Sequence, residues 1–277
     1  MKILRLAATV MCLMNLSALS AQSDSLIENV SFNDILSLPT LEPAAKLSYG
    51  EGEFQYGLLW LPEDTSAPPP LVVFIHGGCW LNSFDVNHGN ALSSSLSQQG
   101  FAVWSMEYRR AGDAGGGWPG SFEDIEAGIN YIRAIDDYNI DGDSFALVGH
   151  SAGGHLALLA GTQFPEASLV IGLAAITNIA LYARGEGSCQ RGAAQFMGAE
   201  PGENPELYAS ANPASQDLHL DSILLHGDAD SIVPLDQATR SGLPLLQLPG
   251  AGHFDWIHSG TYAYSYLLEL LQARLAP

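Results

Sequence analysis

Short apolar runs alternate with segments of helical spacing along most of the chain. The apolar runs predict buried strands at residues 71–75, 101–107, 145–148, 168–174, 222–225 and 244–248. Segments whose apolar positions recur every three or four residues predict helices at 87–99, 121–136, 152–160, 235–241 and 261–275. Strands that alternate with helices pack as a parallel sheet with helices on both faces, so the pattern predicts one α/β domain.

Two further features open this alternating region. Residues 45–62 predict an antiparallel pair of strands turned at 50–52, and a loop at 63–70 with three consecutive prolines ends the pair. Ser121 and Asp124 fit a capping box at the start of the helix predicted over 121–136.

The first 21 residues carry Lys2 and Arg5 ahead of an apolar run that ends in small residues. This pattern is typical of a secretory signal peptide, with cleavage expected after Ala21. The run is short for a membrane anchor and Asn15 interrupts it. We therefore expect an exported protein, periplasmic or secreted, with no stable membrane association after cleavage. Residues 22–44 should form an extended leader with one short helix, and 45–277 the folded domain.

The alternation breaks at about residues 177–217. This segment is rich in Ala, Gly, Pro and Asn and has no strand pattern. Insertions of this length in an alternating chain are usually functional, so we expect a lid over a binding site. The alternative is a surface insertion without a role in binding.

The apolar run at 145–148 leads into Gly149-His150-Ser151-Ala152-Gly153. In this G-x-S-x-G pattern a serine sits on a strained strand-to-helix turn with its hydroxyl exposed. Glycines are needed on either side because a side chain would collide with the neighbouring strand or helix. The pattern alone has little specificity, and its position between a predicted strand and a predicted helix is what favours a nucleophile over a simple turn.

Two later loops supply the groups that such a serine needs. The strand at 222–225 leads to Asp228 and Asp230, and the strand at 244–248 leads to His253 and Asp255. Both loops follow the carboxyl ends of parallel strands, where open α/β sheets place their sites. A serine becomes a nucleophile when a histidine takes its proton and a carboxylate orients that histidine. The order Ser, Asp, His along the chain is the one that this fold uses.

At these residues the chain resembles the α/β-hydrolase superfamily, and within it esterases of the H-G-G-x-W type, similar to acetyl-esterase, feruloyl-esterase and arylformamidase enzymes. The resemblance covers residues 45–275. It rests on four motifs: His76-Gly-Gly-Cys-Trp80, Gly149-His-Ser-Ala-Gly-Gly154, His226-Gly-Asp-Ala-Asp230 with Val233-Pro234, and Gly250-Ala-Gly-His253-Phe-Asp255.

The resemblance implies roles for three side chains. Ser151 would be the nucleophile, His253 the base and Asp230 the acid, because the aspartate three residues before Val-Pro serves in similar enzymes. Asp228 is the competing acid. Asp255 lies too near His253 along the chain to be the first choice.

Attack by Ser151 creates an oxyanion that needs preorganised N–H donors. The backbone of Ala152 should supply one, and Gly78 and Cys79 are the candidates for the other. The sequence departs here from the H-G-G-G form of many lipases. Trp80 is expected either to line the acyl pocket or to pack beneath the loop.

Other polar residues near these motifs have weaker assignments. His150 and Trp118 are candidate substrate contacts, whereas His76 and His226 are expected to bond the loop backbone and His155 to face the helix packing. Arg109 and its neighbours Glu107 and Arg110 form either a substrate rim or, as the simpler account, an ion pair that braces the loop.

Charge and composition exclude several classes of partner. The 30 Asp and Glu residues against 10 Lys and Arg give a formal net charge of −20, with no basic cluster for nucleic acid or an anionic membrane. Histidines 88, 219 and 258 have no metal-ligand spacing, so we expect no metal and no other cofactor. In an oxidising compartment Cys79 and Cys189 either form a disulfide or remain small buried apolar residues. The sequence carries no signal for the oligomeric state.

The expected function is therefore that of an exported serine hydrolase that cleaves a small-molecule carboxylic ester through an acyl-enzyme, with water deacylating it and His253 again as base. One alternative is an amide hydrolase of the arylformamidase or prolyl-oligopeptidase kind, the latter disfavoured because no gating domain precedes the catalytic unit. A remote alternative is a noncatalytic binding protein on the same scaffold, whose usual sign would be an incomplete triad.

Overall fold

A computed structural model of the chain describes residues 28–63 and 66–275. The expected signal peptide, residues 1–21, and the first residues of the leader lie outside the described residues.

The described residues contain one sheet of eight strands in the order β1-β2-β4-β3-β5-β6-β7-β8. Strands β1 and β2 pair antiparallel, as does β2 with β4, and the remaining neighbours are parallel. This sheet confirms the predicted α/β-hydrolase fold class. The strands are β1 (Ala45–Ser48), β2 (Tyr56–Trp60), β3 (Pro70–Ile75), β4 (Ala102–Met106), β5 (Asp141–His150), β6 (Leu169–Leu173), β7 (Ser222–Gly227) and β8 (Leu245–Leu248).

Alternating side chains of the buried strands enter two separate cores. In β3, Val73 faces one core, which is completed by helices α3 (Gly120–Arg133) and α4 (Ala152–Gln163). Phe74 faces the other, which α2 (Asn90–Gln98) and α9 (Tyr262–Leu275) complete. The central strands β3, β4 and β6 are buried on both faces, which is why their sequences are continuous apolar runs, whereas the edge strand β8 is only partly buried.

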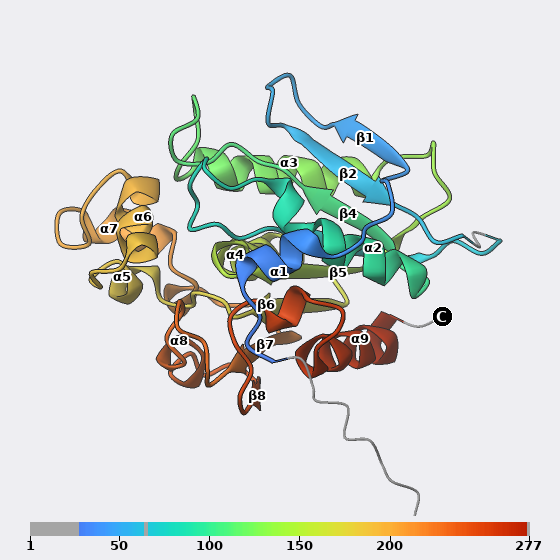
Figure 1. Cartoon of the computed structure of the whole chain (residues 1–277). Helices are drawn as coiled ribbons and strands as arrows, with labels where there is room; N and C mark the ends of the chain where they lie inside the picture. The colour runs from blue at the N-terminus through green and yellow to red at the C-terminus, as the bar shows by residue number, and fades with distance from the viewer. Residues whose placement is uncertain (1–27, 64–65, 276–277) are drawn as a thin grey trace, which may run out of the picture.

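The segment between β6 and β7 folds into short helices, in agreement with its lack of a strand pattern. It contains α5 (Ile179–Tyr182), α6 (Ser188–Met197), α7 (Pro205–Ser210) and the 3₁₀ turn η2 (Pro213–Ser215). Figure 1 shows α5, α6 and α7 gathered at one side of the molecule, away from β1 and β2. The remaining short elements are η1 (Val86–Gly89), α8 (Asp236–Thr239) and η3 (Asp255–Ile257).

The capping box predicted for Ser121 and Asp124 is wrong. Helix α3 has Pro119 at its N-cap without a side-chain cap, and it ends at Arg133 rather than 136. The Ser121 hydroxyl instead donates to the carbonyl of Arg109, while Asp124 accepts two hydrogen bonds from the Arg109 guanidinium at 2.7 and 2.8 Å. Both side chains brace the loop after β4, so they are not available to cap a helix.

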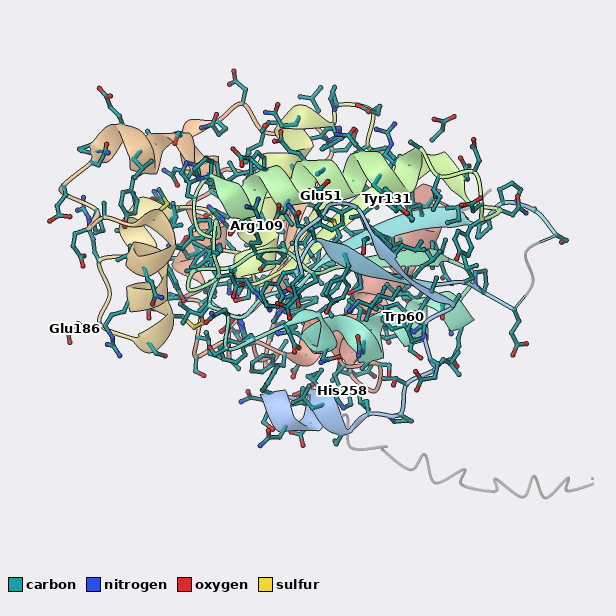
Figure 2. All side chains as sticks on the ribbon, turned by 90° about the horizontal axis from the view of Figure 1, so that it is seen from above. Glu51, Trp60, Arg109, Tyr131, Glu186 and His258 are labelled. Atoms are coloured by element: carbon teal, nitrogen blue, oxygen red, sulfur yellow. A yellow bond between two sulfur atoms is a disulfide. The ribbon has the colours of Figure 1, made fainter. Side chains whose placement is uncertain are left out.

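The described part of the leader, residues 28–44, contains one helix, α1 (Phe32–Ser37), with a capping box between Ser31 and Asp34. Figure 2 shows α1 beside the segment that carries His258. The leader is held there by the buried carboxylate of Asp255, which accepts hydrogen bonds from the backbone N–H groups of Asn29 and Val30, both at 2.7 Å. The same carboxylate accepts the N–H of Gly252 at 2.9 Å, so it joins the leader to the loop after β8.

Removing the Asp255 carboxylate should therefore destabilise the fold. Asp255→Ala leaves backbone donors of the leader and the loop without their acceptor, and we expect a loss of about 2–4 kcal/mol in the free energy of unfolding. Guanidinium unfolding measures it, with the exposed Asp143→Ala as the matched control. Equal stability of the two variants would contradict the proposed role of this contact.

Candidate active site

Ser151 occupies a sharp turn between the end of β5 and the start of α4. Its backbone has φ 57° and ψ −120°, a region that non-glycine residues rarely adopt. A Cβ atom on Gly149 would lie 2.1 Å from the carbonyl oxygen of Gly153, and one on Gly153 would lie 2.1 Å from that of Ile75. The two glycines therefore let strand, helix and neighbouring strand approach closely enough to hold Ser151 in this conformation.

The loop after β3, residues 76–80, lies directly against this turn. A Cβ atom on Gly77 would lie 2.8 Å from the carbonyl oxygen of His150 and 3.0 Å from the Ser151 Cβ. The loop then has positive φ at Gly78, Cys79 and Trp80, at 104°, 56° and 59°. Such a strained backbone persists only when its surroundings fix it.

Buried polar contacts provide that fixation on the β4 side. The His76 ring bonds the Glu107 carboxylate at 3.0 Å and stacks on Tyr108 with centroids 4.5 Å apart. Glu107 also accepts the N–H of Val86 at 2.9 Å and pairs with Arg110 at 3.1 Å. The His76 ring also bonds the carbonyl oxygen of Gly77 through Nδ1 at 2.7 Å, which is the loop-backbone contact that the sequence predicted. The ion pair of Arg110 with Glu107 braces the loop rather than forming a rim of the cavity.

Trp80 and His155 fix the other side of the loop. Trp80 is fully buried, stacks on Phe196 at 5.4 Å, and donates its indole N–H to Nδ1 of His155 at 3.3 Å. His155 in turn contacts the carbonyl oxygen of Ala211 through Nε2 at 2.6 Å, so that ring nitrogen carries the proton. Of the two alternatives for Trp80, packing beneath the loop is the one observed.

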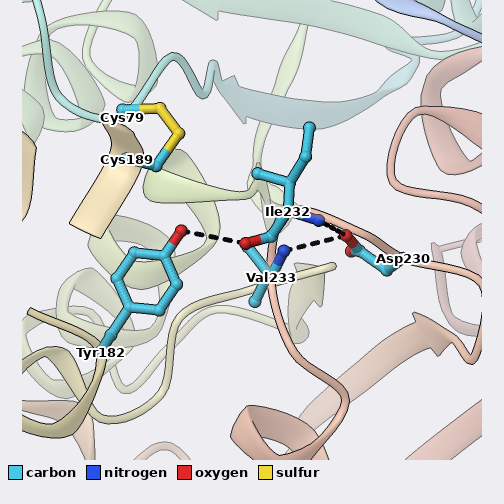
Figure 3. The surroundings of a disulfide bond; sticks show 6 residues. All are labelled: Cys79, Tyr182, Cys189, Asp230, Ile232 and Val233. Atoms are coloured by element: carbon cyan, nitrogen blue, oxygen red, sulfur yellow. Dashed lines mark hydrogen bonds between the residues drawn. A yellow bond between two sulfur atoms is a disulfide. The ribbon is translucent and has the colours of Figure 1, made fainter. Parts of the chain in front are cut away.

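Asp230 and His253 meet across two loops. Nδ1 of His253 lies 2.7 Å from Oδ2 of Asp230. Oδ1 of Asp230 accepts the N–H groups of Ile232 and Val233 at 2.8 and 2.9 Å, as Figure 3 shows. The competing Asp228 is exposed and accepts the N–H of Gly250.

Electrostatics keep Asp230 ionised. Burial by itself raises the pKa of this carboxyl, but the hydrogen bonds from His226 and His253, the electrostatic attraction of His253 and the N–H of Val233 outweigh it and hold the pKa well below its usual value. A histidine that donates its Nδ1 proton to this carboxylate leaves the lone pair of Nε2 free to accept a proton.

A cavity of about 770 Å³ opens above these groups, with both Ser151 and His253 in its wall. Besides the turn of Ser151, six segments of the described chain contribute to the cavity wall: the leader, the loop after β3, η1, the segment before and at the start of α6, and the two loops that carry Asp230 and His253. The lining residues are Phe32, Gly78, Cys79, Leu81, Ser83, Phe84, His88, Ser151, Gly187, Ser188, Cys189, Gln190, Ser231, Ile232, His253 and Phe254.

The inserted helices are joined to the site at two points. Cys79 and Cys189 form a disulfide, with Cα atoms 4.9 Å apart, between the loop after β3 and helix α6. Tyr182 of α5 donates its hydroxyl to the carbonyl oxygen of Ile232 at 3.2 Å, in the turn that holds Asp230. Figure 3 shows both contacts. The sequence left the pairing of these cysteines open, and the structure forms the disulfide.

The three residues predicted to contact substrate, Trp80, His150 and Trp118, do not line the cavity that the described residues form. Trp80 and His150 are fully buried, and Trp118 packs on Phe122 and Phe196 at 5.4 and 6.3 Å. The indole N–H of Trp118 donates to Ser210 at 3.1 Å. Trp118 therefore connects α3 to the inserted helices.

His150 belongs instead to a chain of buried histidines that the sequence gave no means of recognising. Its Nε2 lies 2.9 Å from the carbonyl oxygen of His253, and its Nδ1 lies 2.8 Å from Nε2 of His88. Because a carbonyl only accepts, Nε2 of the neutral His150 carries the proton, and Nδ1 accepts the proton of His88. The chain anchors the backbone of His253. His88 lies sixty-two residues before His150 and has no local motif.

Across residues 28–63 and 66–275, no helix is long and apolar enough to cross a bilayer. The same residues hold no group of three or more His, Cys, Asp or Glu side chains that could bind a metal ion.

A mostly parallel sheet with its candidate site past the carboxyl ends of the strands is the architecture of the α/β-hydrolases, and a solved structure agrees. A truncated carbohydrate esterase from gut microbiota superposes with a TM-score of 0.74 at 21% identity, over 86% of this chain and 98% of that one. The model of the BD-FAE family matches residues 59–241, and the chain belongs to this family. The matched range contains the H-G-G-x-W motif at residues 76–80 and the G-x-S-x-G motif at residues 149–153.

Curated relatives match over part of their length. Esterase LipC of Mycobacterium tuberculosis is 28% identical over 264 residues, 82% of this chain and 64% of LipC. Kynurenine formamidase of Danio rerio is 31% identical over 117 residues, 40% of this chain and 36% of that protein. The chain thus spans less than two thirds of the length of either relative.

The buried histidines predict that the fold loses stability in mild acid. Burial lowers the pKa of His150 to about 3 and of His155 to about 4, and holds that of His88 well below its usual value. In the unfolded chain each has a pKa near 6.5. As the pH falls from about 6.5 to 4, the unfolded state binds protons that the folded state does not. Each histidine should therefore cost about 1.4 kcal/mol of stability per pH unit.

Guanidinium unfolding at pH 7.5, 6.5, 5.5 and 4.5 measures this dependence. His155→Gln should make the slope shallower by about 1.4 kcal/mol per pH unit, since an amide can still donate to the Ala211 carbonyl without titrating. His219→Gln, at a partly exposed histidine, is the matched control. An identical slope for both variants would show that His155 does not contribute.

Proposed function

We propose that the protein is a carboxylic ester hydrolase in which Ser151, His253 and Asp230 form a catalytic triad. One observation carries the proposal: the Asp230–His253 contact of 2.7 Å lies at a cavity whose wall also contains Ser151 on its strained turn. The similarity to esterase LipC supports the reaction class.

In the proposed reaction Ser151 attacks the ester carbonyl while Nε2 of His253 takes the hydroxyl proton. The ionised Asp230 stabilises the imidazolium that forms and holds its ring in the productive tautomer. The alcohol leaves with that proton, and water then cleaves the acyl-enzyme with His253 again as base. The chemistry uses the protein's own side chains, with no metal or cofactor in the mechanism.

We assign the oxyanion hole to the backbone N–H of Ala152 and one of the N–H groups of Gly78 and Cys79. The close approach of Gly77 to Ser151 supports this, because it brings the loop after β3 to the reacting carbonyl. The positive φ values at Gly78 and Cys79 set the direction of these N–H groups before substrate binds. Such preorganised donors need no reorganisation as the oxyanion develops.

The inserted helices are assigned the role of a lid. Gly187, Ser188 and Gln190 line the cavity, and the Cys79–Cys189 disulfide joins this segment to the candidate oxyanion loop. A lid held by a covalent bond so close to Ser151 should remain in place during turnover, so substrate would enter through the open side of the cavity.

A second candidate function is amide hydrolysis, since kynurenine formamidase is among the relatives. The same acyl-transfer machinery serves both reactions, and they differ in the leaving group. Comparing kcat/KM for N-formylkynurenine with that for p-nitrophenyl acetate distinguishes the two.

The triad assignment predicts a near-complete loss of turnover in Ser151→Ala. With p-nitrophenyl acetate or butyrate as substrate, kcat should fall by about a millionfold. The residual rate is the one that the oxyanion hole and substrate binding provide without a nucleophile. A covalent phosphonate should label the wild-type serine and leave Ser151→Ala unlabelled. If the variant keeps most of its activity, the nucleophile is misassigned.

Two aspartates in one loop give a matched test of the acid. Asp230→Asn should lower kcat by about ten-thousandfold because an amide favours the wrong tautomer of His253. Asp228→Asn, two residues away, should retain nearly wild-type kcat. The reverse result would transfer the role to Asp228.

We further propose that the protein is exported and that residues 1–21 are removed in the process. The disulfide between Cys79 and Cys189 supports this, because such bonds persist in oxidising compartments. Sequencing the mature N-terminus after expression in a secreting host should find it after Ala21. A cytoplasmic protein that retains Met1 or Lys2 would contradict the proposal.

A further inference from the structure

The leader supplies an aromatic side chain to the wall of the cavity. Phe32, the first residue of α1, lies beside Phe84 and Phe254, with ring centroids 5.8 and 5.6 Å apart. The three rings come from the leader, the loop after β3 and the loop that carries His253. Each is half-buried, and all three line the cavity.

This aromatic wall (Phe32, Phe84 and Phe254) reaches the reacting groups at both ends. A Cβ atom on Gly78 would lie 2.8 Å from Cγ and 3.1 Å from Cδ2 of Phe84, so this ring touches the candidate oxyanion loop. The ring of Phe254 packs edge-on against His253 with centroids 4.9 Å apart. A group bound against the wall therefore lies next to the bond that is cleaved.

Phe32 is held in place by contacts that the catalytic chemistry does not use. The capping box of Ser31 and Asp34 fixes the first turn of α1, and Ile35 anchors its inner face in the core. The Asp255 carboxylate binds the backbone of Asn29 and Val30 immediately before the helix. Because these contacts surround Phe32 in sequence, its ring is presented to the cavity with little freedom.

The leader is also a feature of this chain beyond the family match. The BD-FAE model covers residues 59–241, which include Phe84 but neither Phe32 nor Phe254. A cavity of about 770 Å³ is far larger than an acetyl group requires, and the aromatic wall has no polar atom to bond a charged or hydroxylated group.

We propose that Phe32 is a specificity-determining residue, which packs against the larger apolar group of the ester and makes the leader part of the substrate-binding site. This inference rests on the proposed ester hydrolysis. The gain comes from removing apolar surface of the substrate from water against a ring that is already ordered. A small acyl or alcohol group would not reach the ring and would gain nothing from it.

Two substrate series measured with Phe32→Ala test the proposal. One keeps the alcohol and varies the acyl group, with p-nitrophenyl acetate and p-nitrophenyl hexanoate. The other keeps the acetyl group and varies the alcohol, with ethyl acetate and 1-naphthyl acetate followed by proton release. In the series whose variable group lies on the wall, the ratio of kcat/KM for the large to the small ester should fall about tenfold or more from its wild-type value.

Phe32→Leu should lie between wild type and Phe32→Ala, which keeps the test usable if the smaller residue impairs folding. Leu36→Ala, on the exposed side of the same helix, is the matched control and should leave both ratios unchanged. Unchanged ratios in both series for folded Phe32→Ala and Phe32→Leu would overturn the proposal. Hydrolysis that survives Ser151→Ala would instead overturn the proposed function, so the two failures are distinguishable.

Discussion

The close approach of the end of β3 to the start of α4 is the constraint on which the candidate site depends. Gly153 has no side chain, so the first turn of α4 can lie directly against the carbonyl oxygen of Ile75. A Cβ atom at this position would be only 2.1 Å from that oxygen. The loop that follows β3 is thereby forced across Ser151, where Gly77 touches it. Any larger residue at Gly153 would separate the serine from the backbone that is proposed to stabilise its oxyanion.

Neutral histidines connect the loops around Ser151 to distant segments through chains of hydrogen bonds. Trp80, His155 and Ala211 connect the loop after β3 to the end of the inserted segment, while His88 and His150 connect η1 to the backbone of His253. An imidazole suits these positions because a neutral ring has one donor and one acceptor on opposite sides and can continue a chain of hydrogen bonds. Burying each ring without charge makes such connections sensitive to acid.

Periodicity predicted the order and kind of the main strands and helices because their apolar side chains face the two cores directly, as in 71–75 and 101–107. The candidates Ser151, Asp230 and His253 could likewise be chosen from the sequence, because each lies in a motif directly after a predicted strand. The capping box at Ser121 failed because local spacing does not reveal a competing partner, here the backbone of Arg109. The pairing of Cys79 with Cys189 stayed open for a related reason, since their separation of 110 residues is closed by tertiary structure alone.

Contacts to the leader were the least accessible to sequence reasoning. The sequence offers Asp255 only as a possible acid. In the structure it binds the backbone N–H groups of Asn29 and Val30, which precede it by 226 and 225 positions, and backbone donors carry no sequence signature. Different parts of the molecule therefore position the candidate site and shape the cavity. Sheet ends position the triad candidates, whereas the leader and the inserted helices, each joined by a few long-range contacts, shape the cavity. Because loops and termini tolerate change better than a sheet buried on both faces, the cavity can vary in shape while the triad candidates stay fixed.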